Sequence, residues 1–175
     1  MTTLRADLAA LFEAAGLTDV DLDATVADEH ARSAAYRRVI AAAVAPSPRD
    51  LAAVLARDPE PLTAKTALVN LVDHLATTDP SKFQQQAAEI AAETNQLAPQ
   101  NREFVRQRLL DWNLWLATEN GQTPSVASLS SASDWMQRRL ADYSASPQTL
   151  ALLAEHGRTK KIRNTAANRT KPTDR

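Results

Sequence analysis

Glycine occurs so rarely in this chain, and its glycines and prolines stand in such regular places, that these two residue types largely decide the fold class. Its 175 residues include only three glycines, each placed after a helical pattern: Gly16, Gly121 and Gly157. A glycine there can take the positive φ that ends many helices. Three prolines follow a residue that favours helix caps, in SPRD (47–50), DPSK (79–82) and SPQT (146–149). A capping residue followed by proline predicts a helix start.

These marks predict an all-α protein of eight or nine helices. Apolar residues make up 44% of the chain and aromatics only 5%, and much of the apolar share is alanine, the best helix former. No alternating strand pattern is visible. The expected helices are 3–15, 22–45, 48–57, 62–77, 80–96, 99–119, 125–144, 147–156 and 158–169. We expect antiparallel pairs, stacked either as a short solenoid or as an irregular bundle.

Apolar spacing places the core on one face of several expected helices. In 99–119 that face holds Val105, Leu109, Trp112 and Leu116. Trp112 is therefore predicted to be core. Trp115 is one position off the face, which favours edge packing or an aromatic contact with a partner. In 125–144 the predicted stripe is Val126, Leu129, Met136, Leu140 and Tyr143.

Three expected helices begin with a related phrase, in which a basic residue follows a small or apolar one. The phrases are LTAKTALVNLVDHL (62–75), EFVRQRLLDWNLWL (103–116) and KKIRNTAANR (160–169), with a weaker copy around Arg32. The pattern resembles HEAT-like helical repeats, and the best matches are VR (105–106) and IRNTA (162–166). The resemblance implies a scaffold that binds partners along an extended surface, and it implies no chemistry.

The C-terminus is strongly basic. Residues 158–175 hold seven basic and one acidic side chain, net +6, while the rest of the chain holds 13 basic and 20 acidic, net −7. We therefore expect a helical domain over 1–157 and a basic helix and tail over 158–175. That helix is either a structural cap, a contact for an anionic partner, or a segment docked on the acidic body. The candidate contact residues are Arg158, Lys160, Lys161, Arg163, Arg169 and Lys171.

The residue types give little for catalysis, so we expect no enzymatic activity, no cofactor and no metal. His30, His74 and His156 each follow an acid, but adjacent helical residues point about 100° apart. The chain has no phosphate-binding glycine loop and no GxSxG motif, and the serines of 125–134 fit the polar face of a helix. The acids Asp19, Asp21 and Asp23 fit a helix N-terminus better than a divalent metal site.

Location and partners are expectations from what the sequence lacks. It has no cysteine, its first residues lack the continuous apolar run of a signal peptide, and no stretch is long enough to span a membrane. A cytoplasmic protein with no membrane partner is expected. Abundant alanine and arginine are typical of a GC-rich bacterial genome. We predict a non-catalytic binding module with a protein partner, the alternative being a nucleic-acid-binding protein that uses the basic C-terminal helix.

Overall fold

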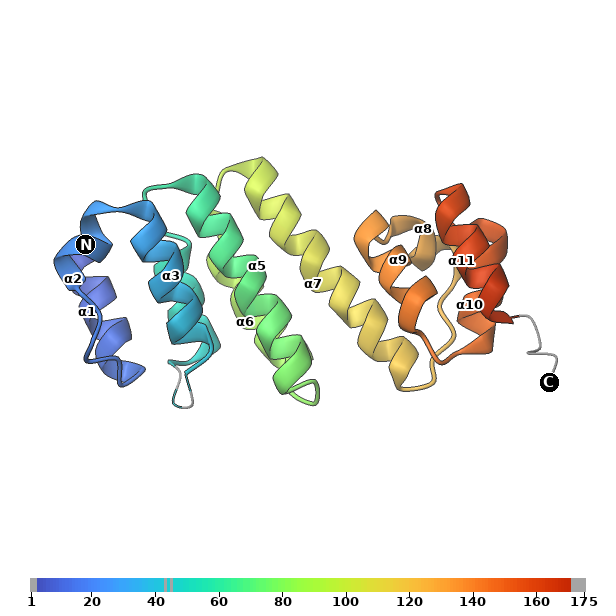
Figure 1. Cartoon of the computed structure of the whole chain (residues 1–175), viewed down its shortest axis with the longest axis horizontal. Helices are drawn as coiled ribbons and strands as arrows, with labels where there is room; N and C mark the ends of the chain where they lie inside the picture. The colour runs from blue at the N-terminus through green and yellow to red at the C-terminus, as the bar shows by residue number, and fades with distance from the viewer. Residues whose placement is uncertain (1–2, 43, 45, 171–175) are drawn as a thin grey trace. The chain divides into compact units, whose positions relative to one another are not determined.

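The structure, a computed structural model, describes residues 3–42, 44 and 46–170. Within this part it consists of eleven α-helices and one 3-10 turn without a strand, so the predicted all-α class is confirmed (Figure 1). Their bounds are α1 Leu4–Ala14, α2 Leu22–Ala27, α3 Glu29–Ile40, α4 Pro48–Leu55, α5 Pro61–Thr78, α6 Phe83–Glu93, η1 Thr94–Gln96, α7 Pro99–Glu119, α8 Val126–Ser131, α9 Asp134–Tyr143, α10 Pro147–His156 and α11 Lys160–Thr170. No helix in these ranges is long and apolar enough to cross a membrane.

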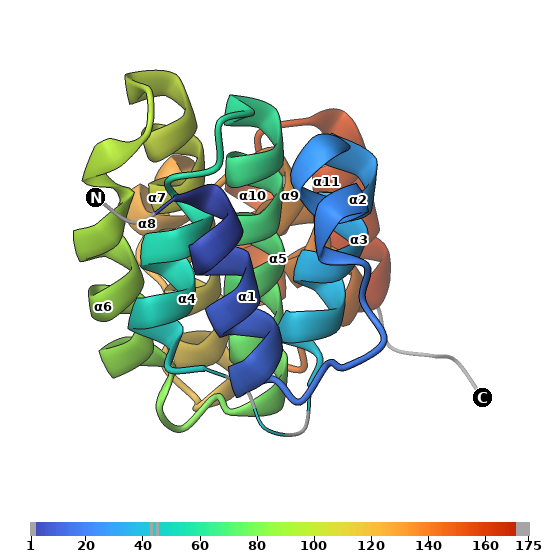
Figure 2. The same cartoon turned by 90° about the vertical axis from the view of Figure 1, so that its left-hand side faces the viewer.

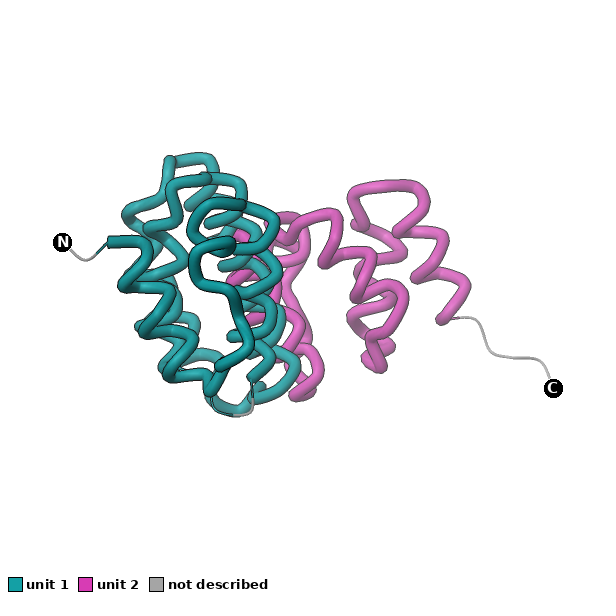
Figure 3. The backbone as a smooth tube through the Cα atoms, turned by 60° about the vertical axis from the view of Figure 1, so that its left-hand side comes forward, with its two compact units in different colours: residues 1–106 teal, residues 107–175 magenta. Residues whose placement is uncertain are grey.

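The chain forms two compact units, residues 1–106 and 107–175 (Figure 3). In unit 1, α1, α4 and α6 form one layer, and α3 and α5 form the other (Figures 1 and 2). Helices α4 and α5, which were expected to pair, pack against each other across the two layers. Helix α2 packs against α1 and α3. Helix α7 begins in unit 1, where the Asn101 amide donates to the Pro61 carbonyl over 3.1 Å.

The cap predictions are confirmed at two of the three proline motifs. Ser47 caps α4 and Ser146 caps α10, each accepting a backbone N–H and each followed by proline at the first turn. The DPSK motif was wrong as a helix start, because α6 begins only at Phe83. Asp79 instead ends α5, and its carboxylate accepts from the Ser81 hydroxyl over 2.9 Å and pairs with Lys82 at 3.2 Å. These contacts lower the Asp79 pKa and hold a turn.

Two expected long helices are each broken into two, which raises the number of helices to eleven. The expected helix 22–45 breaks at Asp28, whose carboxylate accepts the backbone N–H groups of His30 and Ala31 and so starts α3. The expected helix 125–144 breaks at Ser133, which caps α9. Ser133 donates its backbone N–H to Asp111 of α7 over 3.0 Å, and its hydroxyl also binds that carboxylate.

A buried polar network fixes one end of unit 1. Arg32 pairs with Asp58 at 2.9 Å, and the Tyr36 hydroxyl donates to the same carboxylate over 2.7 Å. Asp58 also accepts the Glu60 backbone N–H over 2.8 Å, and Arg32 donates to the Val26 carbonyl over 3.0 Å. The network therefore ties the end of α2 to α3 and to the α4–α5 turn. Each charge is compensated, as burial requires.

Unit 2 encloses its own core. It is built from Leu129, Ala132, Met136, Leu140, Ala141, Leu150, Leu153, Ile162 and Ala166. The stripe predicted for 125–144 is correct at three positions, but Val126 and Tyr143 are exposed. Of the glycines, Gly16 and Gly121 have the expected positive φ, whereas Gly157 has φ −57°. Gly157 is needed for space, because a Cβ there would lie 2.5 Å from the Leu153 carbonyl oxygen.

Candidate functional site

All three tryptophans of the chain gather in unit 2, on facing sides of α7 and α9. Trp112 and Trp115 come from α7, and Trp135 comes from α9. Trp112 and Trp135 meet edge to face, with ring centroids 5.7 Å apart. This geometry is favourable for aromatic pairs because a positive ring edge meets a negative ring face. Trp112 is 2% exposed, which confirms the prediction that it belongs to the core.

Two arginines lie over these rings. The Arg108 guanidinium is 3.7 Å from the centroid of Trp135. The Arg139 guanidinium is 4.6 Å from Trp115 and 4.7 Å from Trp112, and it is 5.9 Å from both Trp135 and Tyr143. Cation–π attraction of this kind is worth about 0.5–2 kcal/mol per pair, depending on burial. We call the six residues Arg108, Trp112, Trp115, Trp135, Arg139 and Tyr143 the arginine–aromatic cluster.

The cluster runs from the core to the surface. Trp112 forms its buried floor, Trp115 and Arg139 are half-buried, and Trp135 and Tyr143 are 36% and 68% exposed. Tyr143 sits outside the core because the α9 residues 135, 139 and 143 share a different face from Met136 and Leu140. An exposed Trp and Tyr beside arginines is therefore a built feature of α9.

A shallow apolar groove also lies in unit 2, between α7 and α8. Its volume is about 250 Å³, and it is lined by Gln107, Leu110, Asp111, Leu114, Ser128, Ser131 and Ala132. The buried Asp111 carboxylate is already engaged, since it accepts from Ser133 and from the Gln107 amide at 2.9 Å. Leu110 is the exposed apolar residue of this groove.

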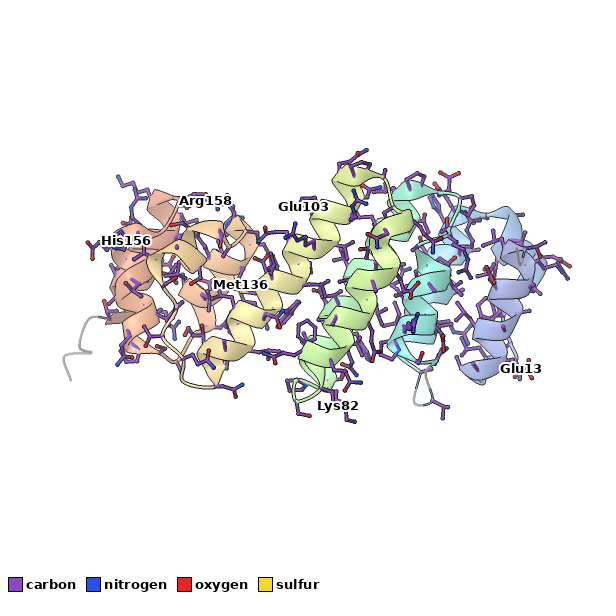
Figure 4. The ribbon with its side chains drawn as sticks, turned by 180° about the vertical axis from the view of Figure 1, so that it is seen from behind. Glu13, Lys82, Glu103, Met136, His156 and Arg158 are labelled. Carbon is purple, nitrogen blue, oxygen red and sulfur yellow. The ribbon has the colours of Figure 1, made fainter. Side chains whose placement is uncertain are left out.

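Most arginines of the basic C-terminal helix are turned to their own unit. Arg158 pairs with Asp134 at 2.7 Å and donates to the Ser130 and Ala132 carbonyls, each over 2.8 Å. It lies with His156 at the junction of α10 and α11 (Figure 4). Arg163 donates to the Gly157 carbonyl over 2.6 Å. These arginines therefore hold helix ends, where a cation suits the dipole.

The remaining predicted contact residues do not share one environment. Arg169 donates to the carbonyls of Ala141 and Ser144 over 3.0 and 2.9 Å, and so closes the end of α9. Lys160 and Lys161 are exposed on α11. Lys171 lies outside the described residues. The buried Ile162 and Ala166 pack α11 into the core of unit 2, as a capping helix would.

The other candidates from the sequence are accounted for by local contacts. Asp21 caps α2 and Asp23 lies in its first turn, as expected, and Asp23 also pairs with Arg5. Asp19 precedes the helix and pairs with Arg38 at 2.6 Å. The Arg38 hydrogen bond lowers the Asp19 pKa. His30 and His156 lie 3.7 and 3.5 Å from the adjacent glutamates, Glu29 and Glu155, in exposed pairs. Among the described residues, no three acidic or histidine side chains gather where they could hold a metal ion.

The basic residues of the repeated phrase make different contacts. Arg32 is in the buried ion pair, Arg163 binds a backbone carbonyl, and Lys65 lies 5.0 Å from the ring centroid of Phe104. Arg106 forms only an exposed pair with Glu103 at 3.6 Å. The phrase thus marks helix starts without a shared contact.

Sequence reasoning missed Trp135, Arg139 and Arg108 as members of the candidate site. A signal was present, since residues 135, 139 and 143 recur every four positions and so share one helical face. The sequence did not show that Trp112 and Trp115 meet that face, because the contact joins helices separated by α8.

No protein-family model matches this chain, and no curated protein and no solved structure matches it either.

Proposed function

We propose that the protein is a non-catalytic binding module that acts in the cytoplasm as an adaptor or scaffold, and that its contact surface is the exposed rim of the arginine–aromatic cluster. The observation that carries the proposal is the exposure of Trp135 and Tyr143 beside Arg139. Tryptophan, tyrosine and arginine are the residues that most often dominate binding energy at protein interfaces. A floor of buried Trp112 makes the rim rigid, which lowers the entropy lost on binding.

The two-layer packing of unit 1 supports the scaffold part of this proposal. Helices α3 and α5 lie side by side in one layer, and α4 and α6 do so in the other. Stacked helix pairs of this kind form the frameworks of helical-repeat proteins, the HEAT-like proteins among them. A binding scaffold suits such a framework because it presents side chains on rigid helices.

The test is affinity capture from an extract of the source cells with three immobilised forms of the chain. The double variant Trp135→Ala/Tyr143→Ala removes the rim. The matched control is Leu62→Ala, which removes a side chain that is 66% exposed in unit 1. We expect the wild type and the control to retain the same protein and the double variant to lose it. Equal capture by all three forms would place the contact elsewhere or show that none exists.

A second candidate is nucleic-acid binding through α11, favoured by the adjacent exposed lysines Lys160 and Lys161. Neutralised phosphates release counterions, so affinity would fall with salt. Changing both lysines to Gln would then flatten the slope of log affinity against log salt by about two units. An unchanged slope, or no binding of duplex DNA or RNA at low salt, would remove this candidate.

A further inference from the structure

The Arg139 guanidinium lies against aromatic rings. Its Nε is buried without a hydrogen-bond partner. Its guanidinium carbon lies over the rings of Trp112 and Trp115, 4.7 and 4.6 Å from their centroids, and a ring face supplies no oxygen acceptor for an N–H donor. In the part of the chain that the structure describes, no carboxylate lies within ion-pairing distance of Arg139. A buried N–H donor without an acceptor costs free energy, and Arg139 has one such donor in its half-buried side chain.

Arg139 differs in this respect from its neighbours in unit 2. Arg158, Arg163 and Arg169 each donate to backbone carbonyls, and Arg138 lies 3.8 Å from Asp134. Among the arginines that the structure describes, Arg139 is the one whose guanidinium lies over two tryptophan rings. The two rings hold the guanidinium in place, and its fork of N–H donors matches the two oxygens of a carboxylate.

We propose that Arg139 is the anchor of an anion site that takes a carboxylate from an acidic segment of a protein partner, with Trp135 and Tyr143 contacting the apolar residues beside it. This inference rests on the proposed function and names the chemistry of the partner. Charge complementarity supports it: residues 107–170 carry eight basic and five acidic side chains, net +3, whereas residues 1–106 carry ten basic and 15 acidic, net −5. An acidic segment is thus attracted to unit 2.

A protein segment fits the surface better than a nucleic acid does. Nucleic-acid binding needs several cations that each meet a phosphate. Here Arg158 and the α11 residues Arg163 and Arg169 are engaged with carbonyls. The rim places the Arg139 guanidinium beside two exposed aromatic side chains, Trp135 and Tyr143. A single bidentate anchor flanked by aromatic contacts is typical of a protein interface.

Intrinsic tryptophan fluorescence tests the site without a label, because all three tryptophans belong to the cluster. The probe is a 12-residue peptide of glutamates with one central phenylalanine, and its matched control has glutamine at every glutamate. The wild type should show a saturable fluorescence change with the glutamate peptide and at least a tenfold weaker response to the glutamine peptide. Loss of a charge-assisted pair at an interface has an effect of about this size or more.

Variants assign the response to Arg139. Arg139→Gln should weaken binding of the glutamate peptide at least about tenfold, and Arg139→Lys should do so less. The control Arg138→Gln, one position away and exposed, should leave affinity within about twofold. Circular dichroism checks that each variant is folded, and the wild-type comparison of the two peptides stands even if a variant is not.

Three results would overturn the inference. They are no saturable response to the glutamate peptide up to about 1 mM, equal binding of both peptides, or tighter Arg139-dependent binding of a single-stranded oligonucleotide of equal charge. If the glutamate peptide fails while partner capture still requires Trp135 and Tyr143, only the anion site is refuted. If partner capture does not depend on Trp135 and Tyr143, both the anion site and the proposed function are refuted.

Discussion

Arg32 and Asp58 form an ion pair in the interior of unit 1, with Arg32 Nε 2.9 Å from Asp58 Oδ2 and both side chains almost fully buried. The pair joins α3 to the turn between α4 and α5. Removing one partner of such a pair leaves an uncompensated charge away from water.

Arg32→Ala should therefore lower the free energy of unfolding by about 3–5 kcal/mol. Arg106→Ala is the matched control, because its pair with Glu103 is exposed, and it should cost less than about 1 kcal/mol. Urea unfolding followed by circular dichroism measures both. Similar losses in the two variants would mean that the Arg32–Asp58 pair does not hold unit 1 together.

Tyr36 should make the stability of unit 1 sensitive to alkaline pH. Burial, and then its hydrogen bond to the Asp58 carboxylate, raise the pKa of Tyr36 far above its ordinary value near 10. A raised folded-state pKa contributes stability that is fully present below the unfolded pKa and lost as pH rises above it. Above about pH 10, Tyr36 should destabilise the protein by up to about 1.4 kcal/mol per pH unit.

Tyr36→Phe removes that titration. Its stability at neutral pH should be lower, since a hydrogen bond to a charged group is lost, but its decline above about pH 10 should be shallower than that of the wild type. Urea unfolding at pH 8 to 11 gives both curves. Parallel curves would show that Tyr36 ionises as easily in the folded protein as in the unfolded one.

Trp112 should contribute far more to stability than the rim of the cluster. Trp112→Ala creates a cavity under Trp135 and Arg139 and should cost about 3–5 kcal/mol. Tyr143→Ala, at a position 68% exposed, should change stability by about 0.5 kcal/mol or less. Thermal and urea unfolding distinguish the two. A large loss for Tyr143→Ala would show that the rim is part of the core.

The C-terminal helix should stabilise unit 2 through its apolar side. Ile162→Ala should cost about 2–5 kcal/mol, because Ile162 is buried among the core residues of unit 2. Lys160→Gln/Lys161→Gln should change stability by about 0.5 kcal/mol or less. Truncation after Gly157 should lower the melting temperature, since it uncovers Leu153. An unchanged melting temperature would contradict the packing role of α11.

The helices were predictable where their signals are local. Ser47 and Ser146 sit beside prolines, and their helices begin where the sequence indicates. At Ser133 the cap itself is local, since its hydroxyl accepts the Met136 backbone N–H, but the Asp111 carboxylate that also binds Ser133 is 22 residues away and is not visible in the local pattern. Asp28 carries a local cap signal that the apolar pattern of 22–45 obscured.

The candidate site was predictable only in part, for a similar reason. Trp115 stands out because it lies one position off the apolar face of its helix. The stacking of Arg139 on Trp112 and Trp115 depends on the packing of α9 against α7. The contacts of Arg158 and Arg169 with backbone carbonyls likewise depend on tertiary packing, which net charge does not reveal.

Site-specific photo-crosslinking to the captured partner tests most directly whether the cluster rim is the contact surface. A photoreactive phenylalanine analogue replaces Tyr143 in one form of the chain, Leu62 in a second and Lys161 in a third. We predict a covalent adduct from position 143 that is lost when Trp135→Ala is added, and little adduct from position 62 or 161. Adducts from position 62 or 161 with none from 143 would contradict it.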